Sequence, residues 1–275
     1  MLSLNIHFAP NHQTIINHFV TASYADSRVI AAFLGGSHAT GMADVHSDLD
    51  LYLITTDKDY DDFLAEREAF VALLGEPLFL EDFGIPDCMF FILSEGTEGE
   101  LWIGRESRFI NIHGGPIQIL VDKQDILADV IFPMQETDPT EQVEFLCKQM
   151  ALFWHEFSHF VKAMGREQLW FAYGSLEALR GMCVSLVRLR HNFKDGDVGE
   201  EPYFKVETVL PVKQLAPLLE TFCPLESVAM YQAAISIVRF YQDIAPHLAR
   251  KHGVAYPEQL ANLMIPQLLA LKPEE

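Results

Sequence analysis

Hydrophobic residues are distributed differently in the two halves of this 275-residue chain. In the first half, short apolar runs alternate with Gly, Pro and charged residues, which is typical of strands joined by turns. The run at 28–34 (RVIAAFL) ends in two glycines and residues 49–55 (LDLYLIT) alternate, so both are expected to be strands. Further strands are expected at 76–83, 88–93, 99–103, 109–112 and 117–121, and helices at 12–24 and 57–74.

From about Thr140 the pattern changes to long stretches with helical periodicity. A Pro-bounded segment at 133–139 is the best candidate for a linker. The sequence therefore predicts an α+β protein, with a mixed β-sheet domain at residues 1–135 followed by a C-terminal helical bundle at 136–275. The expected helices span 140–164, 166–191, 211–221, 226–250 and 257–271, with a polar loop at 192–203.

Composition indicates which class of protein this is and where in the cell it is expected. Hydrophobic residues make up 49% of the chain, which is enough for a sizeable core. No apolar run approaches the roughly 18 residues of a membrane span, and the N-terminus lacks the pattern of a signal peptide, so a cytoplasmic location is expected. The cysteines are far apart in the chain and are expected to be reduced core thiols: Cys88, Cys147, Cys183 and Cys223.

The formal net charge of −20 limits the partners. Such a surface repels nucleic-acid backbones, and no stripe of Lys and Arg offsets it, so long DNA or RNA is not expected to bind. The charge would attract a cationic small molecule, although a solvated acidic surface that aids solubility is the preferred interpretation.

The most informative motif is Gly35-Gly36-Ser37, followed by Asp48-Leu-Asp50. A glycine-serine turn after a strand can bring backbone N–H groups to phosphate oxygens. Asp48 and Asp50 share one face of the next strand because strand side chains alternate, and paired carboxylates suit Mg²⁺. Together these features indicate transfer of a phosphorus-centred group.

The string from Gly35 to Asp50 resembles the signature of the nucleotidyltransferase superfamily, which includes DNA polymerase beta and the aminoglycoside adenylyltransferases. The resemblance is greatest to the streptomycin-type adenylyltransferases and covers about residues 28–180. It implies ATP as substrate, one or two Mg²⁺ ions held by Asp48 and Asp50, phosphates bound at the glycine-serine turn, and a helical domain that binds a small-molecule acceptor. A non-catalytic nucleotide-binding relative, or an ordinary turn and edge strand, are the alternatives.

The same resemblance implies a third acid that completes the metal site or takes the proton of the attacking hydroxyl. Family members carry it on a strand after an acidic-Gly turn, and Glu100 follows such a turn here. Glu98 lies on the same strand face one step earlier, and Asp122 ends a later strand, so both remain candidates.

The segment from Phe153 to Tyr173 resembles the start of the helical domain in streptomycin-type adenylyltransferases. The resemblance implies that Lys162 binds phosphate, whereas Arg166 is expected to form a structural salt bridge. A solvent-facing helical lysine is the alternative for Lys162.

A competing motif is His155-Glu156-Phe-Ser-His159, which matches the H-E-x-x-H pattern of zinc peptidases. Two histidines at i and i+4 share a helix face, and Glu177 could be a third ligand. A peptidase would leave the glycine-serine turn and the acids unexplained, so the nucleotidyltransferase interpretation is preferred.

Overall fold

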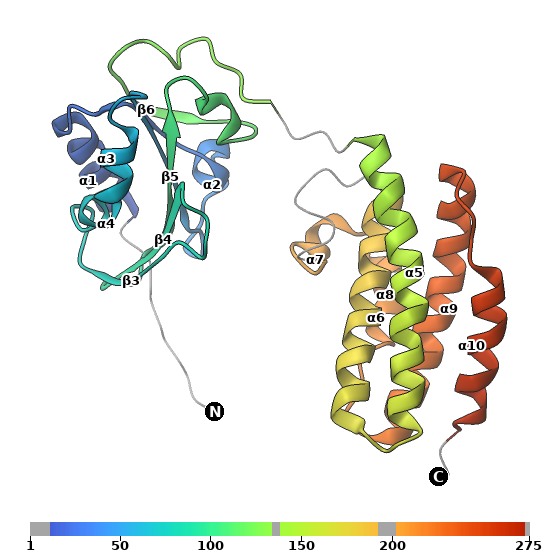
Figure 1. Ribbon diagram of the computed structural model, residues 1–275. Helices are drawn as coiled ribbons and strands as arrows, with labels where there is room; N and C mark the ends of the chain where they lie inside the picture. The colour runs from blue at the N-terminus through green and yellow to red at the C-terminus, as the bar shows by residue number, and fades with distance from the viewer. Residues whose placement is uncertain (1–11, 134–137, 192–201, 273–275) are drawn as a thin grey trace. The chain divides into compact units, whose positions relative to one another are not determined.

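The computed structural model describes residues 12–133, 138–191 and 202–272. The chain divides into two compact units, Met1–Gln135 and Glu136–Glu275, and each is described by itself below (Figure 1). The division falls where the Pro-bounded linker is expected. The functional roles assigned to the two units remain predictions.

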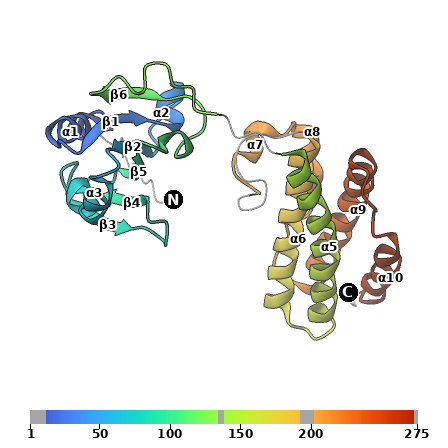
Figure 2. The ribbon, with the colours of Figure 1, turned by 45° about the horizontal axis from the view of Figure 1, so that its top comes forward.

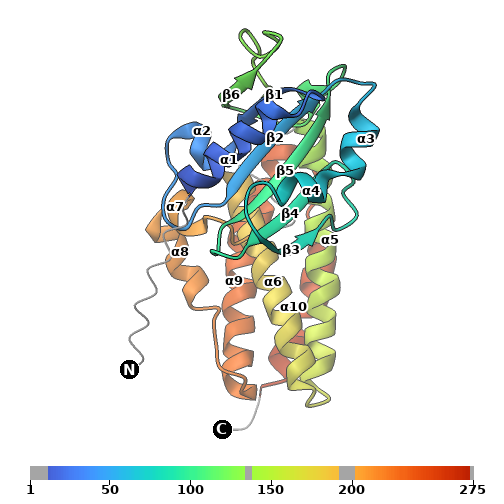
Figure 3. The same ribbon diagram turned by 90° about the vertical axis from the view of Figure 1, so that its left-hand side faces the viewer.

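A six-stranded mixed sheet forms the centre of the N-terminal unit, with strand order β3-β4-β5-β2-β1-β6 (Figure 3). The neighbours β2 and β5 are parallel, and all other neighbouring strands are antiparallel. The strands are β1 (Val29–Leu34), β2 (Leu49–Thr55), β3 (Pro77–Glu81), β4 (Cys88–Leu93), β5 (Glu98–Arg105) and β6 (Gln118–Asp122).

One face of the sheet is covered by three helices, α1 (His12–Ala25), α3 (Tyr60–Ala65) and α4 (Arg67–Val71) (Figures 1 and 2). Alternate residues of the strands, such as Leu51 and Leu101, bury their side chains against these helices. The alternating hydrophobic pattern that predicted the strands therefore corresponds to side chains that point in turn to this core and to the opposite face of the sheet.

The opposite face is only partly covered. Tyr52 stacks on Phe33 with ring centroids 4.7 Å apart, and Phe132 packs beside them in a small second cluster. This cluster covers the part of β2 that follows Tyr52. Asp50 and Glu100, on the same face, are only half-buried.

The structure corrects three of the expected elements. The single helix expected at 57–74 is divided into α3 and α4. The strand expected at 109–112 is a short 3₁₀ helix, Phe109–Asn111, which packs against the bare backbone of Gly104. The glycine-serine turn is itself a short helix, α2 (Gly36–Thr40), which was not anticipated.

The second unit is helical, as expected. Its described helices are α5 (Pro139–Met164), α6 (Leu169–Arg190), α7 (Val206–Val209), α8 (Val212–Leu219), α9 (Ser227–His252) and α10 (Glu258–Ala270). The three long helices, α5, α6 and α9, run side by side (Figures 1 and 3).

An N-terminal cap explains where α5 begins, and stacked aromatic rings pack α5 against α9. Asp138 caps the helix by accepting a hydrogen bond from the backbone N–H of Thr140 at 2.7 Å, and Pro139 occupies the first turn, where a missing N–H costs nothing. In the core, Phe153 of α5 stacks on Tyr241 of α9, with ring centroids 3.5 Å apart.

Two fully buried arginines bind α6 to the chain that follows it. Arg180 donates to the hydroxyl and the carbonyl oxygen of Thr221, both at 2.8 Å, and Arg188 donates to the carbonyl oxygens of Pro202 and Phe204. Buried guanidinium groups need such partners because unpaired buried donors are costly.

All four cysteines are free, as expected, but not all lie in the core. Cys88 and Cys183 are buried, Cys223 is half-buried and Cys147 is exposed on α5, so the prediction of four core thiols is wrong for Cys147. Among the helices that the structure describes, none has both the length and the apolar character needed to cross a lipid bilayer.

Candidate active site

The glycine-serine turn starts directly at the end of β1. Gly35 donates its N–H to the carbonyl oxygen of Asp50 at 3.0 Å, which ties the turn to β2. The turn then forms α2, and Gly41 ends it in the left-handed conformation, at φ +71°. The sequence thus places Ser37 in a short helical turn bounded by glycines rather than in an open loop.

Gly36 brings this turn into contact with the first strand acid. Its φ is +51°, and a Cβ built on it would lie 1.8 Å from Oδ2 of Asp50. Any side chain at Gly36 would therefore displace the Asp50 carboxylate. The second glycine of the motif is required for this close approach, and not only for the turn.

Asp50 and Glu100 lie side by side. They are register partners in the parallel pair β2 and β5, and therefore project from the same face of neighbouring strands about 4.8 Å apart. Burial, with a further contribution from both carboxylates, raises the pKa of Tyr52, the next residue on this face of β2. The two acids thus form one acidic locus beside the glycine-serine turn.

Glu100 is oriented by a residue that the sequence analysis did not select. Trp102 donates its indole N–H to Oε2 of Glu100 at 2.9 Å. Trp102 follows Glu100 by two positions on the same strand, so the i, i+2 spacing was available as a signal. Because one Glu100 oxygen accepts this hydrogen bond, the carboxylate is held in a defined position.

Asp48 lies just before β2 and is exposed. A turn precedes it, in which Ser47 Oγ accepts the backbone N–H of Asp44 at 2.9 Å and Asp44 Oδ1 accepts that of His46 at 2.8 Å. The structure thus places Asp48 two residues ahead of Asp50 at the entrance to the same strand, with its carboxylate in a more open position.

The structure separates Asp122 from the other acids. Its carboxylate accepts the backbone N–H groups of Ile126 and Leu127, at 2.9 and 2.8 Å, and so closes the loop after β6. Asp122 pairs with Ala31 of β1, which pairs in turn with Ile54 of β2. The strand that carries Asp122 is thus two strands away from β2. In register, Asp122 is level with Ile54, which lies about 13 Å further along β2 than Asp50 does.

Glu98 remains close to the acid pair. It is exposed, lies one pleat before Glu100 on β5 and pairs with Ile92 of β4. Unlike Glu100, it has no register partner within β2 as the strand is defined, because the β2–β5 pairing starts at Leu49 and Gly99.

Two histidines lie beside the turn. His38 of α2 and His12 of α1 share a hydrogen bond between Nε2 and Nδ1 of 3.2 Å. Burial lowers the pKa of both rings, while the charge of Asp48 acts in the opposite direction. His12 was not selected from sequence because its partner is 26 residues away.

The residues present fit a divalent cation in part. Within the described ranges, no three His, Cys, Asp or Glu side chains are gathered closely enough to hold a metal ion. However, Asp50 and Glu100 are adjacent carboxylates, and the hydroxyl of Ser37 is buried with no hydrogen-bond partner among the described residues. Hard oxygen donors of this kind suit Mg²⁺, which also uses substrate phosphates and water as ligands.

Lys162 belongs to the helical unit, near the end of α5, and its side chain is exposed. Its expected role in phosphate binding stays a prediction. Arg166 is also exposed and forms no ion pair with any residue that the structure describes, so the structural salt bridge expected for it is not found.

The H-E-x-x-H motif lies on α5, and no described residue provides a third ligand. The rings of His155 and His159 are 4.5 Å apart, and Glu156 Oε2 lies 3.4 Å from Nδ1 of His159. Glu177, the proposed third ligand, instead accepts hydrogen bonds from Arg180 and from the hydroxyl of Tyr203. The described residues therefore do not form the zinc site of a peptidase.

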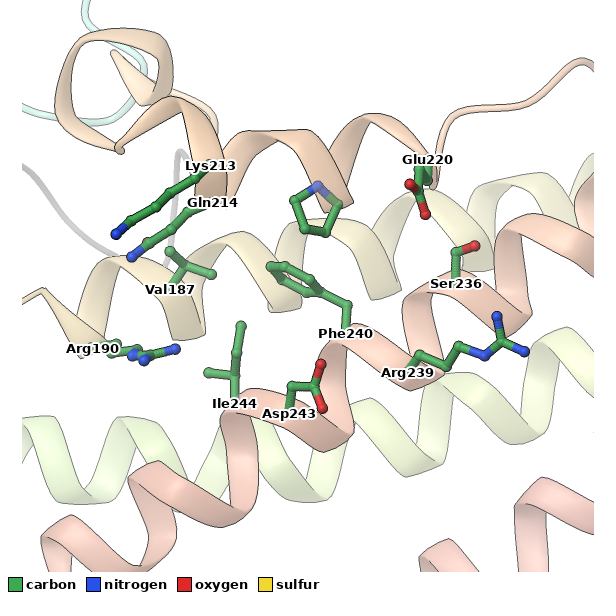
Figure 4. A pocket seen from close by; sticks show the side chains of 11 residues that line it. Val187, Arg190, Lys213, Gln214, Glu220, Ser236, Arg239, Phe240, Asp243 and Ile244 are labelled. Atoms are coloured by element: carbon green, nitrogen blue, oxygen red, sulfur yellow. The ribbon is translucent and has the colours of Figure 1, made fainter.

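A separate cavity of about 350 Å³ lies in the helical unit, between α6, α8 and α9 (Figure 4). Its lining mixes three cations with two carboxylates, and so lacks the single sign of charge that would select a triphosphate or a polycation. The charged residues that line it are Arg190, Lys213, Glu220, Arg239 and Asp243.

A comparison with protein families decides among the interpretations. The model of the streptomycin adenylyltransferase family matches residues 10–268. The chain belongs to this family. It is accordingly an adenylyltransferase, and the family match extends well beyond the 28–180 region in which the motifs were recognised.

Among solved structures, this adenylyltransferase is similar to an aminoglycoside 6-adenyltransferase from Bacillus subtilis, with 14% identity and a TM-score of 0.45. That match covers 95% of this chain and 97% of the other. A search of curated proteins finds no match.

Proposed function

We propose that this adenylyltransferase moves AMP from ATP to a hydroxyl group of a small cationic acceptor, with Mg²⁺ as cofactor. The observation that carries the proposal is the placement of Asp50 between its register partner Glu100 and the backbone of Gly36. A phosphate-binding turn, a metal-binding carboxylate and a candidate base are then within one small region of the sheet.

Asp48 and Asp50 are the residues that would hold the cation, which neutralises phosphate charge and orients the α-phosphorus when it is bound. Backbone N–H groups around Gly35 and Gly36 would bind phosphate oxygens. The Ser37 hydroxyl, which has no partner in the part of the chain that the structure describes, would donate to one of them. Lys162, from the helical unit, would offset the charge that develops on the leaving pyrophosphate.

Glu100 takes the proton from the acceptor hydroxyl. The freed oxygen attacks the α-phosphorus in line, the bond from that phosphorus to the bridging oxygen breaks, and pyrophosphate carries away the electron pair. The products are an AMP ester and pyrophosphate. Trp102 supports this role because its hydrogen bond occupies one Glu100 oxygen and leaves the other for the acceptor.

The family description and the net charge both support a cationic acceptor. The family is described by its action on streptomycin, a cation, and the net charge of −20 favours a cationic ligand. The helical unit would bind part of the acceptor, and the location is expected to be cytoplasmic. No nucleic acid partner is proposed.

Pyrophosphate release tests the proposal. Purified protein is incubated with ATP, Mg²⁺ and streptomycin, and the AMP ester is identified by mass spectrometry. The proposal expects pyrophosphate and ester in equal amounts. ATP binding without release over a panel of hydroxyl-bearing amines would instead identify a nucleotide-binding relative that does not catalyse transfer.

A further inference from the structure

The open face of the sheet continues past Glu100 onto two more strands. Phe90 of β4 pairs with Glu100, and Glu81 of β3 pairs with Phe90. Because directly paired residues project from the same face, Asp50, Glu100, Phe90 and Glu81 form one row across four strands. The row is about 14 Å long at the usual strand spacing.

An exposed aromatic side chain stands beside this row. Phe83 follows Glu81 by two residues, and its ring packs edge-on against Phe90 with centroids 5.2 Å apart. It also lies 6.1 Å from the ring of Phe79. Phe83 and Phe79 are nevertheless 66% and 39% exposed, so the three rings form a surface that the described residues of this unit leave open.

Phe83 is held in a conformation that an aromatic residue seldom adopts. Its φ is +48°, in the left-handed region. Strain of this kind persists where the surrounding structure imposes it, and it is concentrated at ligand-binding positions. The Phe83 ring is exposed, so burial of the ring does not account for this conformation.

Polar contacts impose this conformation. Oε1 of Glu81 accepts the backbone N–H groups of Asp82 and Phe83, at 3.1 and 3.3 Å. Asp82 accepts the N–H of Gly84 at 2.8 Å and pairs with Arg67 at 2.7 Å. The loop is thus fixed from both sides, and it presents the ring next to the acid row.

We propose that Phe79, Phe83 and Phe90 form an aromatic ledge that binds the acceptor, while Glu81 pairs with one of its cationic groups. This inference rests on the proposed function, because Glu100 at the end of the row is the base in that reaction. The ledge is continuous with the proposed active site and has carboxylates on both sides, so it suits a cation with an apolar ring face.

The geometry also defines the spacing within the acceptor. Glu81 and Glu100 are two strands apart in the same row, about 10 Å. The proposed acceptor therefore carries an ammonium or guanidinium group about 10 Å from the hydroxyl that is adenylylated. Neutral sugars would lack the contact with Glu81.

Four variants test the ledge, with streptomycin as the probe. Phe83→Gly removes the ring but suits the positive φ, so the fold should be retained. Phe83→Trp restores an aromatic face. Glu81→Gln removes the charge but can still accept the loop N–H groups. Asp125→Gly is the matched control, because Asp125 is exposed and has a φ of +56° in the loop after β6, away from the row.

Streptomycin binding is measured by calorimetry, and transfer by pyrophosphate release. The expected result for Phe83→Gly and Glu81→Gln is a Kd and KM for streptomycin raised about tenfold, with KM for ATP and kcat little changed. Phe83→Trp should bind like the wild type, and so should Asp125→Gly.

The outcomes separate this inference from the proposed function. Transfer by all variants with unchanged KM for streptomycin would overturn the ledge and leave the transferase standing. Weakened binding in Phe83→Gly and Glu81→Gln, with no transfer even by the wild type, would support the ledge and overturn the transferase. No binding of streptomycin to the wild type would overturn the ledge as a site for such cations.

Discussion

The backbone of Gly36 lies so close to the carboxylate of Asp50 that a Cβ on Gly36 would be 1.8 Å from Oδ2. The contact joins the glycine-serine turn, which we propose binds phosphate, to the strand that carries Asp50, a proposed metal ligand. Replacing the glycine should therefore alter both the stability and the geometry of the site.

Gly36→Ala is expected to reduce AMP transfer about 100-fold, because displacement of a reacting group by an ångström has effects of this size. It should also lower the free energy of unfolding by about 1–3 kcal/mol, since the new side chain meets a clash at a positive φ. Initial rates and urea denaturation provide the two measurements.

Gly41→Ala is the control for Gly36→Ala. Gly41 also has a positive φ, but a Cβ built on it meets no atom within 4 Å. The Gly41→Ala substitution should lower the free energy of unfolding by about 1 kcal/mol and leave most of the activity. Equal loss of activity in both variants would show that strain, and not the contact with Asp50, explains the effect.

Trp102→Phe tests whether the indole positions Glu100, the proposed base. The variant keeps an aromatic ring but loses the hydrogen bond to Glu100, so we expect kcat to fall about three- to tenfold. KM for ATP should be unaffected, because Trp102 pairs with Tyr52 of β2 and Cys88 of β4, and its indole N–H donates to Glu100. A kcat equal to that of the wild type would assign Trp102 a packing role alone.

His113 should make stability depend on pH. Its ring packs against Phe33, Tyr52 and Phe132, and burial lowers its pKa, against a smaller opposite effect of the hydrogen bond to the carbonyl oxygen of Pro116. The unfolded chain then binds more protons, so this contribution is complete above pH 6.5 and is lost as the pH falls below it.

His113→Phe keeps a ring and removes the titration. Urea denaturation of both proteins between pH 7.5 and pH 5 should show that the wild type loses more stability on acidification than His113→Phe does. If both proteins lose the same amount, the ring of His113 is equally easy to protonate in the folded and unfolded states.

In the helical unit, Thr221 is buried and accepts a hydrogen bond from Nε of Arg180 at 2.8 Å. Thr221→Val should lower the free energy of unfolding by about 1–3 kcal/mol, because it leaves part of a buried guanidinium unpaired. The exposed Thr208, which donates to the carbonyl oxygen of Lys205, provides the matched Thr→Val control. A similar small change in both variants would contradict the prediction.

Much of the fold could be predicted because its signals are local. Alternation identified β2 over 49–55, and the long periodic stretches identified α5, α6 and α9 within a few residues. Helix α2 was missed because five residues that include a glycine are too few to show a period.

The site was predicted less completely because register is not a local property. The sequence offered Glu98, Glu100 and Asp122 as alternatives for the third acid of the site. The pairing of Asp50 with Glu100 and the loop contacts of Asp122 distinguish them in space. Lys162 could not be tested in this way because it belongs to the other unit.

The central claim is that the Asp50–Glu100 pair performs metal-dependent AMP transfer. The most direct measurement is pyrophosphate release from ATP and streptomycin by the wild type, Asp50→Asn, Glu100→Gln and the control Asp62→Asn, which changes an exposed acid on α3. Each protein is assayed with Mg²⁺ and after chelation. We expect Asp50→Asn and Glu100→Gln to lose activity about a thousandfold while they unfold at the wild-type urea concentration. Asp62→Asn should match the wild type, and chelation should abolish all transfer. Full transfer by Asp50→Asn, or transfer that survives chelation, would contradict the account.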